Sequence, residues 1–165
     1  MPVTGNKSIL SYSLSIRLCT DGFSFLVHSL GSGQLLLQEN LRCAQDETMA
    51  EALERGFQLP RVRGRQYERV ILYSSSPSTR VPLDEFRRED MLAVYRLTFT
   101  GISPRPEDMR FQVLPSLDVV EIFTLQPSIV DTLKNHYPSA MVQGLYGTML
   151  SQVAEMQQGS TLSVS

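Results

Sequence analysis

The chain has 165 residues, of which 42% are hydrophobic, and a formal net charge of -2 at pH 7. This length suits one globular domain, and the nearly balanced charge excludes the broad basic face on which nonspecific nucleic-acid binding depends. No stretch approaches the roughly 20 apolar residues of a membrane span, and the N-terminus MPVTGNKSIL lacks the pattern of a signal peptide. We therefore expect a cytoplasmic protein that binds neither nucleic acid nor a membrane.

The first part of the chain predicts three antiparallel strands after a flexible lead at residues 1–8. Apolar and polar residues alternate up to Asp21-Gly22, again over 23–28, and a third strand is expected over 34–40. Asp-Gly is a favoured hairpin turn because both central positions can take positive φ. The sequence therefore predicts a type I′ turn at Asp21-Gly22.

The period of the pattern changes after residue 45. The segment Asp46-Glu47-Thr48 offers capping oxygens, and apolar residues then recur at helical spacing up to Phe57. The run VILY at 70–73 is typical of a buried central strand. Crossover helices after the later strands imply that parallel pairing occurs there.

The remaining elements are predicted in the order helix, strand, strand, helix, strand, helix. A helix is expected from Pro82 to about residue 99. Strands are expected at 111–115 and 119–125, a helix at 129–136, a short strand at 140–143, a helix at 145–156 and a polar tail at 157–165. The resulting fold class is α/β, with an antiparallel meander followed by βα units in a mixed sheet, helices packed on that sheet, and a single domain over residues 9–156.

Three segments carry a family resemblance: LSIRLCTDGFSFLVH, VILYSSSPSTRVPLDEFRREDMLAVYRLTF and VVEIFTLQPSIVDTLKNHYPSAMVQG. They resemble domain-of-unknown-function family 3822, an uncharacterised bacterial family assigned an actin-like ATPase fold. The resemblance runs from about Leu14 to Met149 and is most specific in DGFSF, in VP-x-x-x-F-x-x-E-D and in NHYP. It implies a ribonuclease H-like half-domain, the N-terminal half of a two-lobed protein, so that this chain would be a fragment.

The same resemblance raises the question of a phosphate site at the first hairpin. In active members of the superfamily the first strand ends in Asp-x-Gly; the Asp holds Mg²⁺ through water, and the glycine lets backbone N–H groups approach phosphate. Here Asp21 stands directly beside Gly22, and bulky Phe23 and Phe25 follow. A plain turn is therefore the favoured interpretation. If a nucleotide binds, its cofactor-binding residues would be Asp21, Gly22 and Ser75, with Mg-ATP as the cofactor.

The sequence offers no complete catalytic constellation. Two-metal nuclease chemistry needs several converging carboxylates, and the early strands supply only Asp21 and Glu39. The loop Ser74-Ser75-Ser76 follows a predicted parallel strand, where α/β proteins often bind ligands, but no base is positioned and G-x-S-x-G is absent. The favoured interpretation is a polar loop, and we predict no catalytic residues.

Cysteine and histidine do not indicate a metal site either. The two cysteines, Cys19 and Cys43, are too few for a disulfide scaffold and are expected to be reduced. The two histidines, His28 and His136, lie in neither C-x-x-C nor H-x-x-x-H spacing. His136 is expected at a helix end, where it interacts with the dipole.

The sequence does not decide the role of two charged stretches. The segment Arg61–Arg69 contains four arginines and is either a solvated loop or a contact for phosphate or an acidic partner. The stretch Glu85–Asp90 is either an exposed helical face with weak local ion pairs or a docking surface.

These observations lead to a ranked set of functional hypotheses. The first is a non-catalytic, pseudo-ATPase module without a cofactor, which binds a protein partner or its own missing C-terminal half-domain. The second is a nucleotide-binding, ATP-hydrolysing protein whose cleft is completed by that missing half. A stand-alone nuclease-like enzyme is the weakest of the three.

Overall fold

A computed structural model describes the backbone of residues 11–164 and the side chains of residues 11–159. The described chain divides into two compact units. The first ends at Tyr73 and also takes in Ser128–Val142, and the second consists of Ser74–Pro127 and the residues from Gln143 onward. The predicted lead at 1–8 lies outside the described residues, and a single domain over 9–156 stays a prediction.

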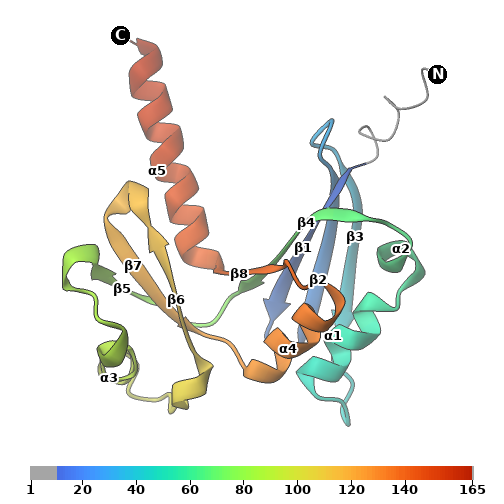
Figure 1. Cartoon of the computed structure of the whole chain (residues 1–165), viewed down its shortest axis with the longest axis horizontal. Helices are drawn as coiled ribbons and strands as arrows, with labels where there is room; N and C mark the ends of the chain where they lie inside the picture. Colours follow the sequence, from blue (N-terminus) through green and yellow to red (C-terminus); the bar gives the residue numbers. More distant parts are fainter. Residues whose placement is uncertain (1–10, 165) are drawn as a thin grey trace. The chain divides into compact units, whose positions relative to one another are not determined.

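The first unit is built on a five-stranded mixed sheet with the strand order β3-β2-β1-β4-β8 (Figure 1). Its antiparallel meander is confirmed, because β1 pairs with β2 and β2 with β3 in antiparallel register, whereas β1 and β4 are parallel. The strands are β1 (Tyr12–Cys19), β2 (Gly22–Ser29), β3 (Leu35–Arg42), β4 (Tyr67–Ser74) and β8 (Met141–Gly144).

The crossover from β3 to β4 passes through α1 (Met49–Phe57) and the short α2 (Pro60–Arg63). Thr48 is the N-cap of α1. Its hydroxyl accepts from the Glu51 N–H, and the Glu51 carboxylate accepts from the Thr48 N–H, which makes a reciprocal capping box. The predicted cap and helix are confirmed, whereas α2 was not predicted.

The helices α1 and α4 (Pro127–His136) cover the same face of the five-stranded sheet (Figure 1). A chain of aromatic rings joins them to it: Phe25 on β2 packs edge-on against Phe57 on α1, and Phe57 packs against Tyr137 directly after α4. Leu53 on α1 and Leu133 on α4 are fully buried. The NHYP segment thus contributes to the core of this unit.

The second unit contains a separate antiparallel sheet of three strands in the order β5-β7-β6, which nothing in the sequence predicted. They are β5 (Thr79–Pro82), β6 (Met109–Leu114) and β7 (Val119–Thr124). The helix predicted from Pro82 begins only at Met91, as α3 (Met91–Thr98), because Thr79–Pro82 pair with β7 and two 3-10 turns follow. Tyr95 on α3 is fully buried and donates its hydroxyl to the Pro77 carbonyl at 2.8 Å.

The last element is α5 (Leu145–Val164), which also belongs to the second unit. The helix predicted to end at residue 156 continues through the segment expected to be a polar tail. It packs against β6 and the 3-10 turn that follows β6, and the Ser116 and Ser151 hydroxyls lie 3.0 Å apart in this contact.

Candidate functional site

The corner between β1 and β2 is the first candidate, and its geometry differs from the prediction. Cys19 and Gly22 pair as the last and first residues of their strands, so the loop residues are Thr20 and Asp21. Among residues 11–164 only Gly33 and Asp118 have positive φ. The type I′ turn predicted at Asp21-Gly22 is therefore wrong.

Gly22 is explained by a close approach of β3 instead. A Cβ at Gly22 would lie 1.9 Å from the Leu41 carbonyl oxygen and 2.9 Å from the Arg42 Cα, both of them backbone atoms. Glycine is used where another backbone comes this close. The same residue that would expose N–H groups to phosphate is here packed against a neighbouring strand.

Asp21 is also engaged with β3. Its carboxylate lies 3.2 Å from the Arg42 Nε, and its carbonyl accepts the Cys43 N–H at 2.7 Å. Both side chains of the ion pair are largely exposed, so the pair contributes little to stability. The ion pair matters locally, because the Asp21 carboxylate at this corner already faces the Arg42 guanidinium.

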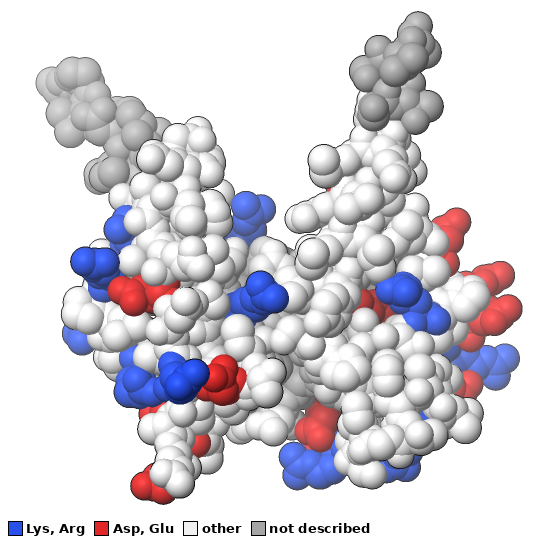
Figure 2. Space-filling view, turned by 180° about the vertical axis from the view of Figure 1, so that it is seen from behind, with Lys and Arg blue, Asp and Glu red and all other residues white. Residues whose placement is uncertain are grey.

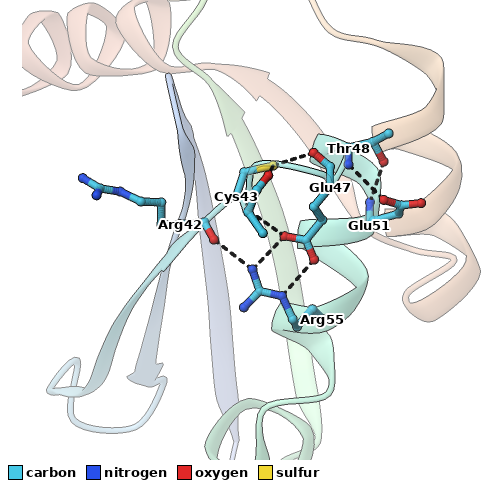
Figure 3. A network of polar contacts seen from close by, with 7 residues as sticks. Arg42, Cys43, Glu47, Thr48, Glu51 and Arg55 are labelled. Carbon is cyan, nitrogen blue, oxygen red and sulfur yellow. Dashed lines mark hydrogen bonds and ion pairs between the residues drawn. The ribbon is translucent and has the colours of Figure 1, made fainter.

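A network of polar contacts behind this corner joins the end of β3 to α1 (Figure 3). Arg55 on α1 donates from Nε and Nη2 to the two oxygens of Glu47, at 2.9 and 2.8 Å, and from Nη2 to the Arg42 carbonyl at 2.8 Å. The Cys43 thiol donates to the Glu47 carbonyl at 3.0 Å. Arg42 thus contacts the hairpin through its side chain and α1 through its carbonyl.

Glu47 has the most strongly perturbed carboxylate in this network. Its hydrogen bonds from Arg55 and from the Ala44 N–H lower its pKa from 4.5 to about 2. A charge-assisted pair with two parallel N–H···O contacts favours the ionised form in this way. The pair ties the segment after β3 to α1, and we assign it a structural role.

The serine loop after β4 is tied to the second sheet. The Ser74 and Ser76 hydroxyls donate to the Thr124 carbonyl at 2.8 and 3.1 Å, and the Thr124 N–H donates to the Ser76 Oγ at 3.1 Å. Ser75 is half-buried in the same connection. It belongs to the second unit, whereas Asp21 and Gly22 belong to the first. The joint use of these three residues by a nucleotide stays a prediction.

Glu121 is a notable residue that sequence reasoning missed. It is fully buried on β7, where its Oε1 accepts from Gln112 Nε2 at 2.8 Å and its Oε2 from the Ser78 hydroxyl at 3.0 Å. The same carboxylate lies against Gly147 in the first turn of α5. A lone acid within the apolar run VVEIFTL was the signal that could have revealed it, since a buried carboxylate needs hydrogen-bond partners.

The helix α5 exposes an apolar stripe. Five large hydrophobic residues at helical spacing share one face and are each between 40% and 73% exposed: Tyr146, Met149, Leu150, Val153 and Met156. Three of them join Pro77, Ser78, Arg80 and Phe99 around a hollow of about 500 Å³ in the second unit. The helix carries only one charged residue, Glu155. We call this surface the α5 stripe.

The described residues contain neither a cluster of metal ligands nor a membrane-spanning helix. No group of three or more His, Cys, Asp or Glu side chains there is placed to hold a metal ion, and no described helix is long and apolar enough to span a membrane. Cys19 and Cys43 are free thiols, and the His136 Nε2 lies 2.6 Å from a Glu54 oxygen. On the face shown in Figure 2, basic and acidic side chains are interspersed.

Nearly the whole chain matches a known protein family. A family model described as "Protein of unknown function (DUF3822)" matches residues 5–165. The chain is a member of the DUF3822 family. The resemblance seen in the sequence is thereby confirmed at the level of the family, and no curated protein sequence matches the chain.

Solved structures place the fold of this DUF3822 member. A protein from Bacteroides thetaiotaomicron VPI-5482, described as having an actin-like ATPase fold and unknown function, is 25% identical with a TM-score of 0.72. The match covers 90% of this chain and 57% of that one. The predicted actin-like fold is confirmed, and the chain spans little more than half the length of its structural relative.

A weaker structural likeness exists to the cytoplasmic domain of EpsL, an inner membrane component of the type II secretion system of Vibrio cholerae. The identity is 16% and the TM-score 0.47, and the match covers 80% of this chain and 57% of that chain. A likeness at this level carries no argument about function.

Proposed function

We propose that this chain is a non-catalytic protein-binding module, a pseudo-ATPase built on an actin-like fold and acting in the bacterial cytoplasm. It would form the N-terminal half of a two-lobed protein. Its partner is an apolar protein surface, supplied by a separate protein or by a second, C-terminal half-domain. No cofactor is required for this role.

The observation that carries the proposal is the α5 stripe. Monomeric proteins seldom leave a contiguous row of large apolar side chains in water, and such rows mark interaction surfaces. Ion pairs would contribute little to the affinity of a partner for this stripe, because Glu155 is the only charged residue in the sequence of α5. Interfaces have cores depleted in charge and enriched in aromatic residues and Met, and Tyr146, Met149 and Met156 fit that composition.

Nucleotide binding is the second candidate, favoured by the fold of the Bacteroides relative. In this alternative the cleft would be completed by the second half-domain, with Mg-ATP bound at Asp21, Gly22 and Ser75. The Arg42 ion pair and the Leu41 backbone packed on Gly22 support the first proposal over this one. A fold shared with ATPases does not by itself imply their activity.

Site-specific photo-crosslinking in cells tests the proposal. A photoreactive residue replaces Met149 or Val153 on the stripe, and the control replaces Gln158, which is exposed elsewhere on the same helix. We expect a discrete adduct from the stripe positions that is absent from Gln158. It should disappear when Leu150→Gln is added. Equal adducts from all three positions, or none from the stripe, would contradict the proposal.

A calorimetric titration of Mg-ATP distinguishes the second candidate. Heat of binding in the micromolar range, lost in Asp21→Ala, would overturn the assignment of the hairpin as a structural corner. Absence of heat at millimolar Mg-ATP supports the binding module for the chain described here.

A further inference from the structure

A hollow on the first unit lies beside the arginine-rich segment whose role the sequence left open. Its volume is about 470 Å³, and it is lined by Tyr12, Pro60, Arg61, Gly64, Arg65 and Gln66. This is within the range of small-ligand pockets, roughly 300–1,000 Å³. Two of the six lining residues are cationic and none is acidic, so the hollow favours an anion.

The backbone under this hollow is held in place by several contacts. Val62 is fully buried, and its carbonyl accepts the Tyr67 hydroxyl at 2.6 Å. The Gly64 N–H donates to the Pro60 carbonyl at 3.1 Å and closes the helical turn. The arginines therefore extend from an anchored turn, which limits the ordering that a ligand would have to impose.

Arg65 is positioned by two contacts. Its guanidinium lies over the Tyr12 ring, 4.9 Å from the centroid, and its Nε donates to the Arg61 carbonyl at 3.4 Å. A guanidinium has five N–H donors in a planar fork, and these contacts engage its face and one donor. An arginine stacked in this way presents a planar fork suited to phosphate.

Arg61 supplies the second cation. Its Nη1 lies 3.9 Å from a Glu39 oxygen, and the two side chains are 74% and 36% exposed. At this distance the contact is an ion pair without a hydrogen bond. An anion in the hollow can replace water around Arg61 without breaking a short contact.

We propose that this hollow binds a small phosphomonoester, with Arg61 and Arg65 holding the phosphate and Gln66 and Tyr12 contacting the organic part. Arginine pairs phosphate oxygens bidentately, and Gln66 adds an amide that can donate to or accept from hydroxyl groups. A nucleic-acid ligand is disfavoured, because the chain has a formal net charge of -2 and is not basic overall. The site involves none of the residues proposed above for Mg-ATP.

Calorimetry with inorganic phosphate and with ribose 5-phosphate tests this proposal. We expect saturable binding of both, with ribose 5-phosphate the tighter ligand. Arg61→Gln and Arg65→Gln should each weaken binding about tenfold or more, as expected for loss of a charge-assisted pair. Arg63→Gln is the matched control, because Arg63 lies on the same helix and is exposed but does not line the hollow; it should change affinity less than about threefold.

Several results would overturn the proposal. One is the absence of saturable binding at about 10 mM of either probe. Another is a loss of affinity in Arg63→Gln equal to that in Arg61→Gln or Arg65→Gln. A third is that ribose 5-phosphate binds no more tightly than inorganic phosphate. Circular dichroism of each variant shows whether it is folded. Because Arg61 is exposed, the Arg61→Gln variant still tests the proposal if Arg65→Gln unfolds. Loss of binding in Asp21→Ala would place the anion at the other corner of the sheet and contradict the proposal as well.

Discussion

The Cα of Gly22 faces the Leu41 carbonyl so closely that a Cβ there would lie 1.9 Å from that oxygen. The atom it would meet belongs to a backbone paired on β3, which cannot move aside as a flexible side chain can. The glycine of the first hairpin is therefore required by the packing of three strands, and this requirement is independent of any ligand.

Replacing Gly22 with alanine should destabilise the first unit. The added methyl forces β2 and β3 apart, and overpacking of this kind typically costs about 1–3 kcal/mol. Urea denaturation followed by circular dichroism measures the change. Gly31→Ala is the control, because its Cβ would have no neighbour closer than 4.0 Å, and we expect a change within about 0.5 kcal/mol. Equal midpoints for the two variants would contradict the packing argument.

Glu47 should make the stability of the first unit depend on acidity. Its pKa is lowered from 4.5 to about 2 in the folded state, so the folded protein binds fewer protons than the unfolded chain between these values. Its contribution to stability is fully present above about pH 4.5 and is lost as the pH falls toward 2. Denaturation at several pH values should therefore show Glu47→Gln less stable than the parent at pH 7 and nearly equal to it near pH 2.

The control for this pH dependence is Glu68→Gln, an exposed change on β4. The gap between parent and Glu68→Gln should stay small at every pH. A gap for Glu47→Gln that is constant between pH 2 and 7 would show that the Arg55 contact does not favour the charged carboxylate.

Alkaline pH should weaken the fold through its buried and half-buried tyrosines. Burial raises the pKa of Tyr67 to about 12 and raises the pKa of Tyr73, Tyr95 and Tyr137. The folded protein holds these phenol protons above pH 10, where the unfolded chain releases them, so stability falls as the pH rises from about 10 toward 12. Absorbance titration at 295 nm should show tyrosines ionising late in the folded protein and near pH 10 in denaturant.

Tyr67→Phe is the matched variant for this titration. It should remove one late-titrating group and cost about 0.5–1.5 kcal/mol at pH 7, because the hydroxyl donates to the Val62 carbonyl. Ionisation of all tyrosines together near pH 10 in the folded protein would show that these phenols are not shielded from water.

The first unit was largely predictable from sequence, because its signals are local. Alternation predicted the three strands, and the capping oxygens of Asp46-Glu47-Thr48 predicted the start of α1. What alternation could not show was why Gly22 is a glycine. The reason is the lack of space for a Cβ beside the Leu41 carbonyl, nineteen residues along the chain. A two-residue motif carries no information about that distant strand.

The second unit was predicted poorly for a related reason. Thr79–Pro82 contains a proline and only four residues, so it gives no strand pattern of its own, and it becomes β5 only by pairing with β7. The run VVEIFTL was predicted as an apolar strand of one mixed sheet, yet β7 is the middle strand of a separate antiparallel sheet. The burial of Glu121 could not be predicted from hydrophobic periodicity, because its hydrogen-bond partners Ser78 and Gln112 lie on other segments of the chain.

Glu121 should hold the first turn of α5 in place. Glu121→Ala removes the carboxylate that accepts from Ser78 and one of the two acceptors of Gln112, and it opens a cavity. We expect a loss of about 2–4 kcal/mol. Glu121→Gln should be much milder, because its amide oxygen can accept from Gln112 while its NH₂ donates to the Ser78 hydroxyl, which is able to rotate and accept. A difference between these two variants separates hydrogen bonding from charge at this site.

Hydrogen exchange of α5 measures the consequence for the helix that carries the exposed stripe. Exchange over residues 145–151 should quicken in Glu121→Ala. It should also quicken in Gly147→Ala, whose Cβ would lie 2.5 Å from a Glu121 oxygen. Gly159→Ala, with open space around it, should leave exchange over 145–151 unchanged. If Glu121→Ala also leaves it unchanged, the buried carboxylate does not anchor α5, and the stripe owes its position to the Ser116–Ser151 contact and the β6 packing alone.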